Sequence, residues 1–111
     1  MTLALAASAA SAQHQAINLA IAAGKVGEVC MPLQAGDTLM WRYQSSAAAD
    51  FNLHDHVGQQ VNMPVQRKAV RRARAQHTLE RTNEWCLMWT APRTKGITVT
   101  GAWQVKSATP R

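Results

Sequence analysis

Short stretches in which apolar and polar residues alternate run along most of the chain. Residues 38–44 (TLMWRYQ) show the pattern most clearly, because Leu39, Trp41 and Tyr43 fall on one face of an extended backbone. Successive side chains of a strand point to opposite faces, so this period of two predicts a strand with one buried face. Further strands are predicted at residues 16–22, 28–33, 50–57, 60–65, 84–90 and 96–105.

Turn-forming residues separate these stretches at intervals of about ten positions. Glycine marks the turns after the first strand and at Gly36 and Gly58, and the serine and alanine run at residues 45–49 predicts a loop. Pro32 lacks a backbone N–H, which predicts a strand at a sheet edge or a strand end there. Short strands with regular turns predict an all-β fold, a small antiparallel β-sandwich of about seven to eight strands in one domain over residues 13–111.

One segment departs from the alternation and is strongly basic. Its five cations are Arg67, Lys68, Arg71, Arg72 and Arg74. A helix would place like charges four positions apart, so we predict a long exposed connection between strands. Two interpretations of this basic loop stay open. It is either a solvated segment that keeps the protein soluble, or a surface that binds phosphates, anionic lipid head groups or an acidic protein.

Composition limits the class of protein. The chain has 111 residues, 47% of them hydrophobic, with 12 Lys+Arg against 6 Asp+Glu and a formal charge of +6. This length predicts one domain, and no apolar run approaches the roughly 18 residues of a transmembrane helix. Nucleic acid is not an expected partner, because no aromatic residue is interleaved with the arginines and no known reading motif occurs.

The first residues predict export. Residues 2–12 (TLALAASAASA) are small and apolar, and Ala10 and Ala12 flank a serine as in signal peptidase sites. No basic residue precedes Lys25, so residues 1–12 are predicted to be a truncated signal peptide, with a disordered leader as the alternative. The former predicts a periplasmic or secreted protein.

The two cysteines, Cys30 and Cys86, lie too far apart in the sequence for a CxxC redox motif. Two cysteines permit one pairing, and an oxidising compartment favours a disulfide between them. Two free buried thiols and two soft metal ligands are the alternatives.

The sequence His54-Asp55-His56 is the candidate metal site. Residues two apart on a strand project from one face about 7 Å apart, a separation that rotation of two imidazoles closes around one ion. A third ligand would come from one of His77, Met63 and Met88. Such a set suits copper or zinc. The alternative is that both histidines are polar residues of the solvent face. Asp55 falls on the core side, which predicts a strand end, a basic partner or a bulge.

The chain offers little catalytic chemistry. Ser45 and Ser46 lack a nucleophile-elbow context, and the carboxylates show no informative spacing. We therefore predict a protein that is not an enzyme and needs no cofactor. Of the four tryptophans, at least three are expected in the core, with Trp103 partly exposed.

The order of these features resembles the GOLD domain of the emp24/p24 secretory-pathway proteins. The resemblance rests on residues 28–31 (EVCM), 35–39 (AGDTL), 50–53 (DFNL) and 85–90 (WCLMWT), and covers residues 16–105. It implies a β-sandwich with a Cys30–Cys86 bridge, used for contact with an unidentified protein or small ligand. The chain lacks the coiled coil and transmembrane tail of that family. The expected function is thus an exported, non-enzymatic GOLD-like binding module, with a periplasmic copper- or zinc-binding protein as the alternative.

Overall fold

The computed structural model describes residues 14–108, which form one antiparallel β-sheet. Its strands are β1 (Gln15–Ile21), β2 (Val26–Leu33), β3 (Thr38–Val57), β4 (Gln60–Thr78), β5 (Asn83–Thr90) and β6 (Ile97–Lys106). This part of the chain contains no helix with the length and apolar character that a membrane crossing requires. The predicted leader at residues 1–12 lies outside the described residues.

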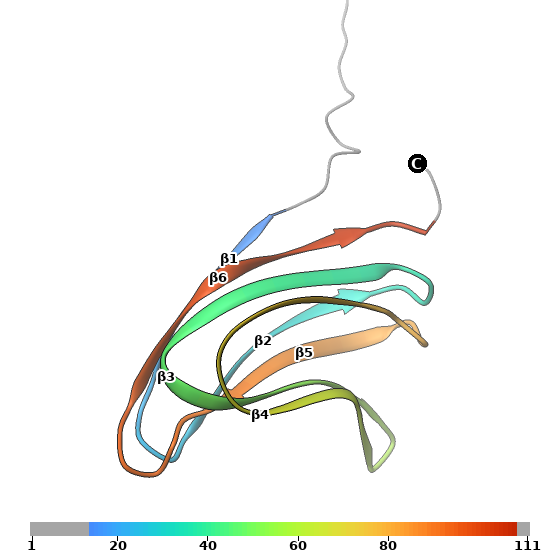
Figure 1. Cartoon of the computed structure of the whole chain (residues 1–111). Coiled ribbons are helices and arrows are strands. Elements are labelled where there is room, and N and C mark those ends of the chain that lie inside the picture. The colour runs from blue at the N-terminus through green and yellow to red at the C-terminus, as the bar shows by residue number, and fades with distance from the viewer. Residues whose placement is uncertain (1–13, 109–111) are drawn as a thin grey trace, which may run out of the picture.

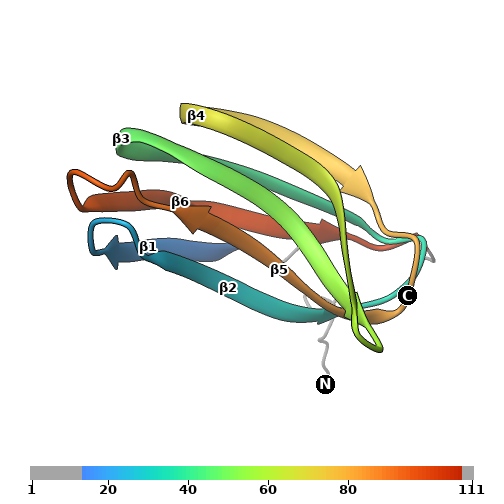
Figure 2. The same cartoon turned by 90° about the horizontal axis from the view of Figure 1, so that it is seen from below.

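The long strand β3 organises the sheet. The strand order is β1-β6-β3-β5-β2, and β4 pairs with the remaining edge of β3. Residues 38–45 of β3 pair with β6, whereas residues 50–55 pair with β5. The sheet therefore bends in the middle of β3 and β4, and its two halves face each other (Figure 1). Figure 2 shows β4 along one margin and β1 and β2 along the other.

The bend falls where the side chains are small. The pairing of β3 with β4 shifts register between Gln44 and Ala49, and Ala69 of β4 has a φ of 53°. Register shifts of this kind bend a strand and increase its twist. The serine and alanine run at residues 45–49 thus lies within β3, and its prediction as a loop is wrong.

The core lies between the two halves of the sheet and is rich in aromatic rings. Trp41 and Tyr43 come from the first half, and their rings lie 5.6 and 5.2 Å from that of Phe51 in the second half. Trp89 packs edge-on against Tyr43 at 5.3 Å. Such contacts add to the free energy gained by burying large apolar side chains.

The inward face that the alternation predicts is confirmed. Leu39, Trp41 and Tyr43 are at most 4% exposed. Trp85 and Trp89 are fully buried as well, whereas Trp103 is only partly buried. The tryptophans therefore do not form an exposed platform for sugars or lipids.

The predicted number of strands is wrong, and one curled sheet takes the place of the two sheets of the predicted sandwich, although the all-β antiparallel class is confirmed. Residues 38–44 and 50–57 belong to one strand, β3, and residues 60–65 continue into the basic segment as β4. The basic segment is therefore not a connecting loop. Its backbone pairs with β3 on both sides of the bend, and all five of its cations are exposed.

The predicted disulfide is confirmed. Cys30 and Cys86 are direct partners in the register of β2 and β5, and their sulfur atoms are bonded. This bond excludes free thiols and cysteine metal ligands. The edge position predicted from Pro32 is also confirmed, because β2 ends the strand order.

Candidate binding sites on the outer faces

The outer face of the first half collects arginines. Because Leu39, Trp41 and Tyr43 point inward, the residues between them on β3 point outward. The register then places Arg42 directly opposite Arg74, and Gln44 opposite Arg72. Arg71 lies at the bend, where its Nη2 donates to the carbonyl oxygen of Ser46 at 3.0 Å. We call Arg42, Arg71, Arg72 and Arg74 the arginine face.

The arginine face holds like charges without compensation. Like charges directly opposite on neighbouring strands are destabilising. Within the described residues, the ion pairs with carboxylates are formed by other cations. Arg42, Arg72 and Arg74 have no carboxylate partner there. An anion supplied from outside would relieve this repulsion.

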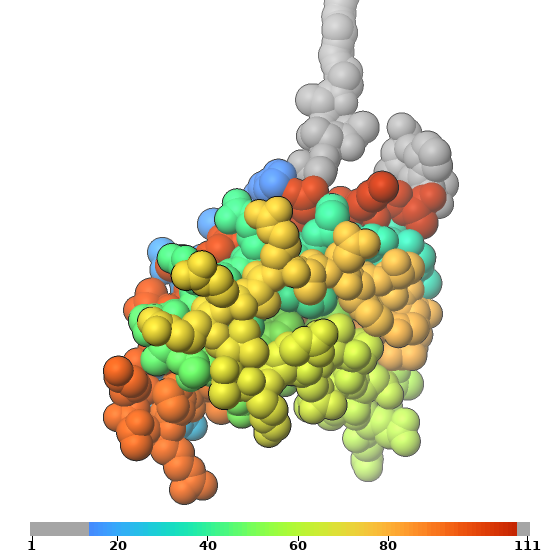
Figure 3. Space-filling view, in the orientation of Figure 1, coloured from blue at the N-terminus to red at the C-terminus, as the bar shows by residue number. Residues whose placement is uncertain are grey.

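Three adjoining hollows run along this face, across β4, β3 and β6. The first is lined by Arg42 and Arg74 together with Met40, and the other two extend it past Arg72. None of the residues that line these hollows is acidic. Figure 3 shows side chains of β4 (yellow to orange) crossing the side of the molecule turned to the viewer.

Gly101 brings β6 close to β3 beside these hollows. A Cβ atom at Gly101 would lie 2.7 Å from the Cα of Tyr43 and closer still to the carbonyl oxygen of Arg42. Real Cβ atoms do not approach backbone atoms so closely, so only glycine fits this position without a backbone shift.

The predicted basic segment divides at the bend. Arg71, Arg72 and Arg74 join the arginine face, whereas Arg67 and Lys68 lie in the other half of β4. Lys68 lies 3.8 Å from the carboxylate of Asp50, and Arg67 donates to its neighbour's carbonyl oxygen.

Arg42 was missed by the sequence reasoning, which attended to the run of cations alone. Arg72 and Arg74 alternate with Ala73 and Ala75, a pattern that is typical of a strand. A strand at these residues can pair with the strand that contains Arg42, so this alternation is the sequence signal for Arg42.

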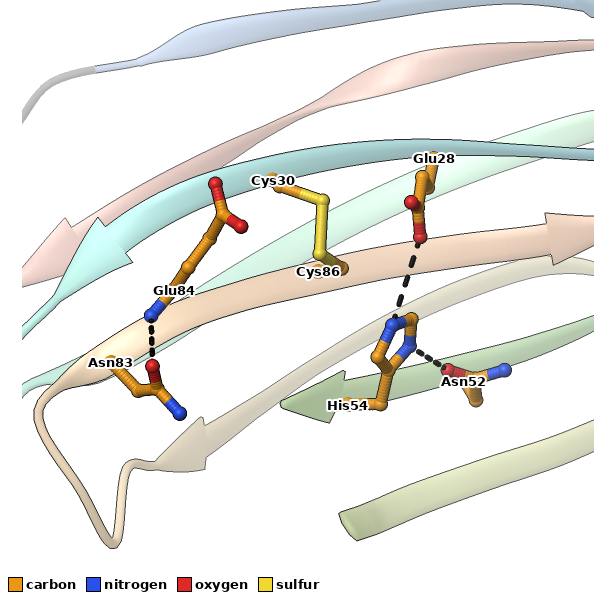
Figure 4. The surroundings of a disulfide bond; sticks show 7 residues. All are labelled: Glu28, Cys30, Asn52, His54, Asn83, Glu84 and Cys86. Atoms are coloured by element: carbon orange, nitrogen blue, oxygen red, sulfur yellow. Dashed lines mark hydrogen bonds and ion pairs between the residues drawn. A yellow bond between two sulfur atoms is a disulfide. The ribbon is translucent and has the colours of Figure 1, made fainter. Parts of the chain in front are cut away.

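The outer face of the second half carries the disulfide and His54. The register places Cys30, Cys86 and His54 in one row across β2, β5 and β3. His54 is 5% exposed. Its Nδ1 lies 2.7 Å from Oδ1 of Asn52, and its Nε2 lies 3.7 Å from Oε1 of Glu28 (Figure 4). An amide oxygen only accepts hydrogen bonds, so Nδ1 carries the proton and Nε2 presents a lone pair in the neutral ring.

The surroundings of His54 favour the neutral imidazole. Burial lowers the pKa of His54, and the nearby carboxylate of Glu28 opposes this effect only in part. His56, on the same strand, is exposed, and its ring centre lies 5.2 Å from that of His54. The two imidazoles thus lie side by side on one strand.

The predicted third ligands lie in different places. His77 pairs with Leu39 in the first half of the sheet, and its Nε2 lies 3.0 Å from Glu80. Met63 is exposed on β4. Met88 occupies the register position between Glu28 and Asn52, next to His54. Glu28 itself was missed, because its strand lies far from His54 in the sequence.

Asp55 has a structural role beside this site. It is fully buried and accepts hydrogen bonds from Nε and Nη2 of Arg81 at 2.9 and 2.8 Å, and a third from Asn83 at 3.0 Å. These bonds hold the pKa of Asp55 below its usual range. The pairing also ties the connection between β4 and β5 to β3, and a register shift lies between Leu53 and Asp55.

The fold has a counterpart among solved structures. No known protein family matches the chain, and no curated protein sequence matches it. The crystal structure of PliG from Aeromonas hydrophila, a periplasmic lysozyme inhibitor of g-type lysozyme, superimposes with a TM-score of 0.60 and 16% sequence identity. The alignment covers 93% of this chain and 91% of PliG. The chain therefore shares the fold of PliG.

The resemblance to the GOLD domain is wrong. No family supports it, and the structural likeness is to PliG. The features behind the resemblance are a distant cysteine pair and short aromatic strands. Small exported sheet proteins of different folds often combine a disulfide with large buried side chains, so these features do not separate one such fold from another.

Proposed function

We propose that this protein is an exported, non-enzymatic binding module whose arginine face docks on an acidic surface of a partner protein. The observation that carries the proposal is the cross-strand pair of Arg42 and Arg74, flanked by Arg72, on a face without carboxylates. The disulfide supports an exported location, periplasmic or secreted.

The chemistry of the face favours a protein over a membrane or a polyanion. Protein interfaces are enriched in Arg, Trp and Met and depleted in Lys, Asp and Glu. The arginine face shares part of this composition, since Met40 lies beside Arg42 and Arg74, and no Lys, Asp or Glu lines the three hollows. A partner would bury the half-buried Met40, and the arginines would orient it through their charge.

A lysozyme is the partner class that we propose to test first. PliG, which has the same fold, inhibits g-type lysozyme. Glycoside hydrolases work with paired carboxylates at the scissile bond, so their catalytic clefts present negative charge. An arginine face without acidic residues is complementary to such a cleft.

Wild-type protein is expected to inhibit a g-type lysozyme, and Arg72→Ser/Arg74→Ser is expected to weaken inhibition at least tenfold. Loss of two charge-assisted contacts costs at least about 1.4 kcal/mol, which is a factor of ten in affinity. The inhibition constant and the association rate, measured at 50 and 300 mM NaCl, check this expectation. Salt screens charges and slows association that is steered by electrostatics. The association rate of the variant should therefore depend much less on the NaCl concentration than that of the wild type.

The matched control is Arg67→Ser/Lys68→Ser. It removes two cations from the same strand, but from the other side of the bend. We expect this control to inhibit as the wild type does. Absence of inhibition by the wild type, or equal losses in both variants, would contradict the proposal. Stronger binding to phosphatidylglycerol vesicles than to the lysozyme would assign the arginine face to membranes.

A further inference from the structure

The lone pair on Nε2 of His54 faces a carboxylate oxygen across a gap. The distance of 3.7 Å between Nε2 and Oε1 of Glu28 exceeds hydrogen-bond length. With its proton on Nδ1, neutral His54 has no proton to share with Glu28, so two electron-pair donors point toward one space. Two ligand atoms on one tetrahedral zinc ion, each about 2.0–2.1 Å from the metal, lie about 3.4 Å apart. The observed separation is close to this value.

We propose that Glu28 and His54, completed by His56, bind one zinc or copper(II) ion on the outer face of the second half of the sheet. Imidazole and carboxylate ligands suit these ions. The site lies across β2 and β3, on the half of the sheet opposite the arginine face. It is therefore independent of the proposed protein-binding function.

The surroundings of His54 are those of a metal ligand. Metal-binding histidines usually donate their second ring N–H to an oxygen, which fixes the tautomer and the orientation of the ring. Oδ1 of Asn52 accepts that bond here at 2.7 Å. The ring is also buried at 5% exposure, so little motion is left to freeze when an ion binds.

His56 supplies the third ligand. Two imidazoles on one tetrahedral ion have ring centres about 5 Å apart, and those of His54 and His56 are 5.2 Å apart. His56 is exposed, so its side chain is free to turn toward the ion. Cys86 lies within 4.8 Å of the ligand atoms of Glu28 and His54, but its sulfur is bonded to Cys30 and offers no thiolate.

A second histidine and carboxylate pair provides the control. Nε2 of His77 lies 3.0 Å from both oxygens of Glu80, which is hydrogen-bond distance and leaves no space for an ion. The two pairs therefore contain the same residue types in different geometry.

Calorimetric titration of tag-free, disulfide-intact protein with ZnCl₂ and with CuCl₂ tests the site. We expect one equivalent to bind with micromolar or tighter affinity. His54→Asn and Glu28→Gln should each weaken binding at least tenfold, and His56→Asn should weaken it as well. His77→Asn should bind as the wild type does. Histidine ring NMR signals, recorded during the zinc titration, should shift for His54 and His56 and not for His77.

The outcomes separate a site from adventitious binding. No saturable binding at one equivalent, or a loss of affinity in His77→Asn equal to that in His54→Asn, would overturn the proposal. Glu28 is 43% exposed at its side chain. Glu28→Gln therefore provides a folded variant even where replacement of the buried His54 impairs folding, and unchanged affinity in Glu28→Gln would remove the carboxylate from the site.

Discussion

Replacement of Arg81 by methionine is expected to lower the free energy of unfolding by about 1–3 kcal/mol, because it leaves the buried carboxylate of Asp55 without a cation. Asp55 is fully buried, and Arg81 donates two of the hydrogen bonds that it accepts. The other donors, Asn83 and Asn62, are neutral amides. Methionine keeps much of the length of the arginine side chain, so the loss is chiefly electrostatic.

The pH dependence of the same variant identifies the cause. In the wild type, Arg81 keeps the pKa of Asp55 below the usual 3.8. The contribution to stability is thus fully present above pH 3.8 and is lost as pH falls through the lower pKa of the folded protein. Without Arg81, burial should raise the pKa of Asp55. The folded variant then takes up a proton more readily than the unfolded chain. The difference in free energy of unfolding between the wild type and the variant should therefore become smaller between pH 7 and pH 4.

Urea unfolding of both proteins at several pH values measures this effect. Arg93→Met, at an exposed turn position, is the matched control and should change stability by less than about 0.5 kcal/mol. Asp55→Asn should cost less than Arg81→Met, since the side chain of Arg81 is 39% exposed and reaches water. A deficit in Arg81→Met that stays constant with pH would show that lost packing, and not the charge of Asp55, is responsible.

Local alternation predicts which residues face the core, but not where strands end. Leu39, Trp41 and Tyr43 are buried as their period of two indicates. Residues 45–49 have the composition of a loop, yet their backbone continues β3 because β4 lies alongside and small side chains permit a bend. The β4 partner of Ala49 is Val70, 21 positions further along the chain and beyond the reach of a local pattern.

In the candidate sites, too, the local sequence predicts contacts within one strand but not contacts between strands. His54 and His56 are adjacent because both lie on one strand, which the sequence predicts. Glu28 reaches His54 through the order of β2, β5 and β3, and Arg42 reaches Arg74 through the pairing of β3 with β4. Cross-strand neighbours are set by register, and register depends on the whole sheet. The inward position of Asp55 predicts a basic partner as one explanation, but the sequence does not indicate which cation it is. The fold places Arg81 against it.

Removal of the disulfide is expected to cost about 4 kcal/mol, because Cys30 and Cys86 close a loop of 56 residues in the unfolded chain. The double variant Cys30→Ala/Cys86→Ala should retain the native fold, since Cys30 is exposed and Cys86 packs on the outer face rather than among the core rings. Such a loss is a large part of the 5–15 kcal/mol by which small domains are typically stable.

Urea unfolding of the double variant and of the wild type, with and without reductant, measures this contribution. A disulfide that acts by restraining the unfolded chain also changes how steeply stability falls with urea. The m-value should rise in the variant, because an unfolded chain without the cross-link exposes more surface. The reduced wild type should match the variant in both quantities.

The alternative is that the bond acts in the folded state by holding β2 to the sheet. β2 ends the strand order and pairs through its whole length with β5 alone, while Met31 and Leu33 bury their side chains in the core from this margin. Hydrogen exchange separates the two mechanisms. If the bond restrains the unfolded chain, the amides of β2 and β3 should lose protection equally, in step with global stability. Faster exchange confined to β2 would contradict that mechanism, because only local opening of the edge strand exposes its amides while β3 stays paired.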